Sequence, residues 1–193
     1  MLREDAVREL KNIYATLQAD LYEAQELHKA LDNQFARRVL VRAFFAFIEG
    51  LAYNLRQVTL ASCKELPNVS LGELFLLREQ MYEIDEKGKM KSPRDKFLAT
   101  GSGFLFSLRM YPKAHGGQYN PQLGDGGWEA FKNALLLRDS ITHPKSAEKL
   151  EISDNALMNF AQAAEWGKSA IRGMFDACDE ADKRIKMNFQ KNE

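Results

Sequence analysis

Three polar residues whose side chains suit acid–base chemistry lie close together in the segment LLLRDSITHPKS, residues 135–146. They are Arg138, Asp139 and His143. A histidine can donate or accept a proton near neutral pH, and the planar guanidinium of an arginine can stabilise negative charge on oxygen. Asp139 precedes His143 by four residues, so on a helix it can orient the imidazole or pair with Arg138. The segment is therefore a candidate catalytic site.

The helix that carries these residues determines where they point. An apolar line with steps of three and four runs from Trp128 to Leu135, and its next step falls on Arg138. Arg138 is therefore predicted to point inward or into an interface. Pro144 disfavours helical geometry at His143, which places the imidazole at the helix C-terminus, where the helix dipole favours its protonated form.

A purely structural role explains the same pattern. Basic residues in the last turn of a helix commonly cap free carbonyl groups, and a proline just beyond is an ordinary stop signal. An arginine followed by a histidine five residues later also arises by chance in many chains. Spacing alone therefore does not separate a helix cap from a catalytic pair.

Helical periodicity dominates the rest of the chain, and no stretch alternates as a strand would. The expected fold class is all-α, an antiparallel bundle of about six helices in a single domain over residues 1–193. Its expected parts are a long N-terminal helix at 4–31, a core bundle at 35–180 and a polar, fraying tail at 181–193. Within the core bundle we expect a second helix at 35–63 and a third that begins at Ser70 with a capping box to Glu73. A fourth helix is expected to begin at Ser92 and Pro93, followed by a Gly-rich surface loop at 111–127. A fifth helix is expected from Trp128 and a sixth after Ser153.

Composition limits the classes of function. The chain has 27 basic and 27 acidic residues, so any binding of nucleic acid must depend on a local patch. Cys63 and Cys178 lie far apart without a partner pattern, which predicts buried thiols and argues against a metal or redox site. The charged N-terminus and the interrupted apolar stretches predict a soluble cytoplasmic protein with no membrane association.

The motif RDSITHP resembles the signature of the HEPN (higher eukaryote and prokaryote nucleotide-binding) family, in which an arginine is followed by a polar residue and then by a histidine. The helical pattern with its aromatic-rich helix RAFFAFIEGLAYNLR is also similar to that family, over roughly residues 35–180. The resemblance implies a metal-independent endoribonuclease of a defence or toxin system, active on RNA as a homodimer in which two motifs face each other. His143 would transfer protons and Arg138 would stabilise the phosphorane, without a metal or cofactor.

The alternative is a non-catalytic HEPN-like helical module that binds a partner protein, such as an antitoxin, or a nucleotide. In that case Arg138 and His143 serve as interface and cap.

Several other residues are candidates for supporting roles. Asp139 and Thr142 flank the catalytic pair, and Lys145 follows it as a candidate for binding phosphate. Glu49 belongs to a polar stripe on the second helix, which is either a solvated face or a cleft wall where Glu49 fixes a catalytic residue and Arg42 binds phosphate. The other members of the stripe are Arg38 and Arg56.

Residues outside the motif have structural interpretations. His28 lies on an apolar stripe and is expected to be a packed core residue, whereas His115 is expected to be exposed in the Gly-rich loop. A group of basic residues forms either a solvated face or a set of phosphate contacts: Lys87, Lys89, Lys91, Arg94 and Lys96.

Overall fold

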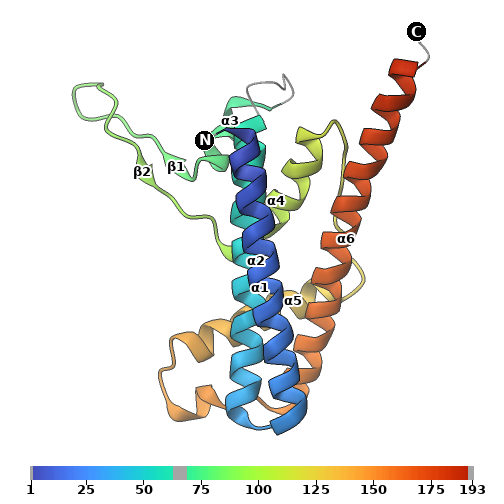
Figure 1. Cartoon of the computed structure of the whole chain (residues 1–193). Helices are drawn as coiled ribbons and strands as arrows, with labels where there is room; N and C mark the ends of the chain where they lie inside the picture. The colour runs from blue at the N-terminus through green and yellow to red at the C-terminus, as the bar shows by residue number, and fades with distance from the viewer. Residues whose placement is uncertain (1, 63–68, 191–193) are drawn as a thin grey trace.

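The computed structural model describes residues 2–62 and 69–190, and these form an all-α bundle, as the periodicity predicts. The long helices stand roughly upright in Figure 1, and a β-hairpin extends away from them on one side. In chain order the elements are α1 (Arg3–Leu31), α2 (Gln34–Ser62), α3 (Leu71–Leu77), β1 (Gln80–Met81), β2 (Arg94–Asp95), α4 (Thr100–Ala114), α5 (Gly127–Thr142), the 3-10 helix η1 (Ala147–Leu150) and α6 (Asp154–Gln190).

α1 and α2 pack as an antiparallel helical hairpin with a turn at Asp32 and Asn33. Asp32 adopts a left-handed backbone (φ 35°), and its N–H donates to the carbonyl of His28 at 2.9 Å, which ends α1. The side chain of Asn33 accepts a hydrogen bond from the N–H of Ala36 at 2.9 Å and so begins α2. These two residues act as the turn and cap that the sequence predicts.

The core is centred on α2, which packs against α1 on one side and α4 on another. Phe131 of α5 lies where four helices meet. Its ring is 5.7 Å from that of Phe45 on α2, 5.6 Å from that of Phe104 on α4 and 5.1 Å from that of Trp166 on α6. Burial of these large rings stabilises the packing of α5 against the other helices.

The capping box of the third helix is confirmed, since the side chain of Ser70 accepts from the N–H of Glu73 and the Glu73 carboxylate accepts from the N–H of Ser70. The fourth helix predicted at Ser92 and Pro93 is wrong. Those residues lie in a hairpin arm, which we define as residues 78–98, and α4 begins only at Thr100. A helix at residue 92 would have no apolar face to bury, because charged residues dominate until the apolar run of α4 starts.

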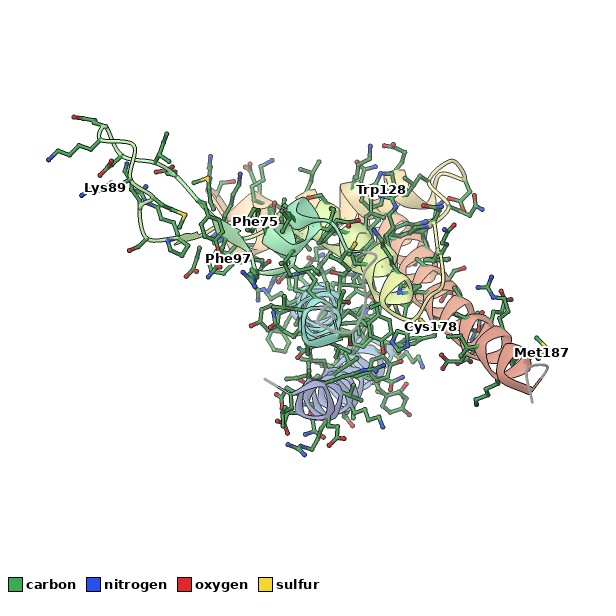
Figure 2. All side chains as sticks on the ribbon, turned by 90° about the horizontal axis from the view of Figure 1, so that it is seen from above. Phe75, Lys89, Phe97, Trp128, Cys178 and Met187 are labelled. Atoms are coloured by element: carbon green, nitrogen blue, oxygen red, sulfur yellow. The ribbon has the colours of Figure 1, made fainter. Side chains whose placement is uncertain are left out.

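The sheet of the arm is short. β1 and β2 pair antiparallel, with Gln80 opposite Asp95, and an isolated bridge joins Ile84 to Met90 farther out. The arm leaves the body of the molecule and carries Lys89 at its far end (Figures 1 and 2). This hairpin has no recognisable strand pattern in the sequence, because its paired segments are only two residues long.

The Gly-rich loop is shorter than predicted. α4 continues through Tyr111 and Pro112 to Ala114, so the loop spans residues 115–126. Burial explains the extension, because the ring of Tyr111 packs edge-on to Phe175 of α6, with centroids 6.1 Å apart. His115, expected to be exposed, is instead half-buried beside Tyr111, with ring centroids 4.8 Å apart.

Residues 181–190 of the predicted polar tail are helical, because α6 continues from Asp154 to Gln190, and residues 191–193 lie outside the described residues. Ala181 is buried, and the backbone of Gly117 lies so close to α6 that an added Cβ would meet the carbonyl oxygen of Ala177 at 3.0 Å. Cys178 is the buried thiol that the sequence predicts, and burial raises its pKa to about 12. Cys63 lies outside the described residues. No helix in the described ranges has the length and apolar character needed to cross a membrane.

Candidate active site

Arg138 lies where α2, α4 and α5 meet, and three side chains hold its guanidinium. Nη2 donates to the carboxylate of Glu49 and to the hydroxyl of Thr100, the latter at 2.6 Å. Nη1 pairs with the carboxylate of Asp139 at 3.1 Å. Three contacts from three helices fix the guanidinium more firmly than a single surface ion pair would.

The Arg138 side chain points inward and is 20% exposed. Its guanidinium carbon lies 5.6 Å from the centre of the Phe45 ring, a cation–π contact that supports the plane from below. Nε is buried and makes no hydrogen bond with the residues described. The two outer nitrogens therefore carry the polar contacts, at the edge of the site that faces Glu49 and Asp139.

Glu49 and Thr100 are hydrogen-bonded to each other as well as to the guanidinium. The Thr100 hydroxyl accepts from Arg138 and donates to a carboxylate oxygen of Glu49 at 2.7 Å. Glu49 thus receives hydrogen bonds from both residues. About half of its side chain remains exposed, so solvent and ligands reach the ion pair.

His143 is the C-cap residue of α5, and its N–H donates to the carbonyl of Asp139 at 2.9 Å. Its side chain is exposed, and within the described ranges it makes no hydrogen bond or ion pair. Asp139 therefore takes one of the two roles open to it and pairs with Arg138 rather than with His143. The imidazole is left accessible to a ligand at the end of α5.

Other predicted site residues hold the end of α5 in place. The Thr142 hydroxyl donates to the carbonyl of Arg138 at 2.7 Å, and Arg42 donates to the carbonyl of Ile141 at 2.6 Å. Arg42, proposed to bind phosphate, is thus already bonded to the free carbonyls at the C-terminus of this helix. Lys145 is exposed just beyond it and forms no ion pair with a described residue.

The polar stripe of α2 does not form one cleft wall. Arg38 donates to the carbonyl of Leu150 at 3.0 Å and so binds the segment after α5. Arg56 is buried and bonds to Ser107 at 2.9 Å and to Glu79 at 2.8 Å, away from Arg138. The interpretation of the stripe as a solvated face is wrong for Arg56, because its head is satisfied inside the protein.

Thr100 and Phe45, which contact Arg138 from α4 and α2, were not among the predicted site residues. Thr100 is separated from it by 38 residues and carries no motif of its own. The fourth helix was predicted to begin at Ser92 rather than at Thr100. A helix that begins at Thr100 places its first residue beside α5, and this could have identified Thr100 as a contact of Arg138. His28, expected in the core, is largely buried with its Nδ1 3.7 Å from the carboxylate of Asp32.

Among the described residues no three histidine, cysteine, aspartate or glutamate side chains are grouped as metal ligands would be. No protein-family model matches the chain, and comparisons with curated proteins and with solved structures gave no significant match. The function must therefore be argued from the site.

Proposed function

We propose that the protein is a metal-independent endoribonuclease of HEPN type, active as a homodimer in a cytoplasmic defence or toxin system. The observation that carries the proposal is the arrangement at the end of α5. A guanidinium fixed by Glu49, Thr100 and Asp139 lies on the same terminal turns as the exposed imidazole of His143, which has no hydrogen-bond partner among the described residues.

The chemistry of these two side chains suits RNA cleavage. His143 can accept the proton of the 2′-hydroxyl or donate one to the leaving oxygen. Arg138 can stabilise the negative charge that develops on the phosphorane, since a fixed cation requires little reorganisation during the reaction. Glu49 and Thr100 then serve as positioning residues that set the plane of the guanidinium.

One arginine and one histidine form a small active site, and a second copy of the chain would double it. Leu136 lies seven residues before His143, about two turns away on the same face of α5, and is 69% exposed. An apolar side chain so near the site would gain stability by burial in an interface. A twofold dimer that covers Leu136 would bring the two His143 side chains toward each other and exclude water from the reacting phosphate.

A second candidate function is supported by the ion pairs themselves. Arg138 contacts two carboxylates, those of Glu49 and Asp139, and a guanidinium neutralised in this way is also suited to a purely structural role. In that case the chain is a non-catalytic helical module that binds a partner protein, such as an antitoxin, or a nucleotide.

Incubation of the purified protein with labelled RNA in excess chelator tests the proposal. We expect cleavage that leaves a cyclic phosphate or a 3′-phosphate, because the 2′-hydroxyl is the nucleophile and no metal is needed. The His143→Ala protein, purified in the same way, controls for contaminating nuclease. Products with 3′-hydroxyl ends, or a magnesium requirement for the chemical step, would contradict the assignment. Absence of cleavage under all conditions would favour the binding module.

A further inference from the structure

A pocket of about 460 Å³ lies between the hairpin arm and α2, outside the Arg138 site. α2 forms one wall, and the base of the arm forms the other. Its lining residues are Tyr53, Gln57, Leu60, Arg78, Glu79, Gln80, Asp95 and Phe97. Tyr53 follows Glu49 by one helical turn on α2, so the pocket adjoins the candidate active site.

Two exposed aromatic rings line this pocket from different elements. Tyr53 of α2 is 47% exposed and Phe97 of the arm is 80% exposed. Figure 2 places Phe97 near the body of the protein rather than at the far end of the arm with Lys89. Aromatic rings exposed in this way offer flat surfaces on which another planar group can stack.

A buried ion pair fixes the geometry of both walls. Arg56 of α2 is 6% exposed, and its guanidinium donates to Ser107 and to Glu79, the residue that leads into β1. Glu79 also accepts hydrogen bonds from the N–H of Lys96, at its carbonyl, and from the N–H of Leu98, at its carboxylate. Both chain segments at the base of the arm are thus attached to α2.

The same arginine supports one of the aromatic rings. The guanidinium carbon of Arg56 lies 5.9 Å from the centre of the Tyr53 ring, so one side of the ring is held by a buried cation. The side chain of Tyr53 remains half-exposed, and the pocket is therefore formed before any ligand arrives.

The polar lining suits the edge of a nucleobase. The amide of Gln57 can both donate and accept hydrogen bonds, and the Asp95 carboxylate accepts them. Gln80 offers its side-chain N–H groups, because its Oε1 already accepts from the Tyr82 hydroxyl at 2.9 Å. Arg78 is an exposed cation in the pocket lining, and its guanidinium forms no ion pair with any described residue. Planar surfaces, mixed donors and acceptors, and an available cation match a base attached to a phosphate.

We propose that this pocket binds an unpaired nucleobase of RNA, adjacent to the bond that Arg138 and His143 cleave. The base stacks on Tyr53 and Phe97, and Arg78 contacts its phosphate. The proposal rests on the proposed ribonuclease function and makes the preferred substrate single-stranded at this position, because bases in a duplex do not expose their faces for stacking.

The test measures binding in the His143→Ala background, where RNA is not cleaved, with a short fluorescent single-stranded RNA and the same strand annealed to its complement. We expect Tyr53→Ala and Phe97→Ala each to weaken single-strand binding by about 5- to 150-fold, the range for loss of one stacking partner. Tyr53→Phe keeps the ring and should bind as the parent does. Phe35→Ala, which removes an exposed aromatic ring at the other end of α2, should also leave binding unchanged.

The outcomes separate the two proposals. Photocrosslinking of 5-iodouridine RNA to Tyr53 or Phe97 would support the pocket directly. If the protein binds and cleaves RNA while Tyr53→Ala and Phe97→Ala bind as the parent does, the pocket proposal is overturned and the ribonuclease function stands. Equal binding of the duplex also overturns the pocket proposal. If the wild-type protein neither binds nor cleaves RNA, the ribonuclease function itself fails.

Discussion

Thr100, the first residue of α4, accepts a hydrogen bond from Arg138 of α5 at 2.6 Å and donates one to Glu49 of α2 at 2.7 Å. One hydroxyl thus links three helices at the centre of the candidate site. Thr100 also comes two residues after Leu98, which is bonded to the buried Arg56–Glu79 pair at the base of the arm. The orientation of Arg138 is therefore connected to the position of the arm through a short segment of chain.

Replacement of Thr100 by valine tests whether this hydroxyl positions the guanidinium. Thr100→Val keeps the shape and removes both hydrogen bonds of the hydroxyl, the one from Arg138 and the one to Glu49. Loss of the bond from Arg138 alone costs about 1.5 kcal/mol if it is felt in the transition state. We expect RNA cleavage to slow by about tenfold in single-turnover measurements, with the free energy of unfolding lowered by no more than about 1 kcal/mol. Ser102→Ala is the control, because that hydroxyl bonds to the carbonyl of Ala99 and not to Arg138. A variant that unfolds more easily but cleaves RNA normally would make Thr100 purely structural.

His143→Ala separates catalysis from capping. If the imidazole transfers protons, cleavage should fall by about 100- to 10,000-fold. Stability should change by no more than about 1 kcal/mol, since the exposed side chain provides only an interaction with the end of α5. RNA cleavage and urea unfolding measured on the same preparations give both numbers. Full activity combined with a lower melting temperature would show that the residue only ends the helix.

Leu136→Glu tests the homodimer. If Leu136 is buried in a dimer interface of at least about 1,000 Å², a glutamate in its place would bury an unpaired carboxylate, which is strongly unfavourable. Light scattering at micromolar concentration should report a dimer for the wild type and a monomer for Leu136→Glu, with cleavage lost in the monomer. Tyr22→Glu, on the exposed face of α1, should remain dimeric. The opposite pattern would place the interface on α1 and separate it from the candidate site.

The sequence was sufficient to predict the long helices, because their apolar periodicity and caps are local properties. The turn at Asp32 and Asn33 and the capping box at Ser70 depend on residues within three or four positions of each other. The hairpin arm depends instead on pairing across a long turn, and its position on α2 depends on the contact between Arg56 and Glu79. No local pattern contains that information.

The candidate site shows the same division. Arg138, Asp139 and His143 were found because they lie close together on one helix. Thr100 was not found because only the packing of α4 beside α5 brings its hydroxyl to the guanidinium. The inward position of Arg138 followed from the apolar line of α5. Spacing allows Asp139 to pair with either Arg138 or His143, and only the side-chain geometry shows that it pairs with Arg138.

His115 gives the protein a predictable dependence on pH. Burial beside Tyr111 lowers its pKa, Arg3 acts in the same direction, and the charge of Asp182 opposes them. Because the folded-state pKa is below the ordinary value near 6.5, the unfolded chain binds this proton more readily, and stability should fall as the pH drops below about 6.5. Urea unfolding between about pH 7 and pH 5 should show this loss. His115→Gln should flatten that part of the profile, even if loss of the ring contact lowers stability at every pH. A slope that is unchanged in His115→Gln would assign the dependence to other groups.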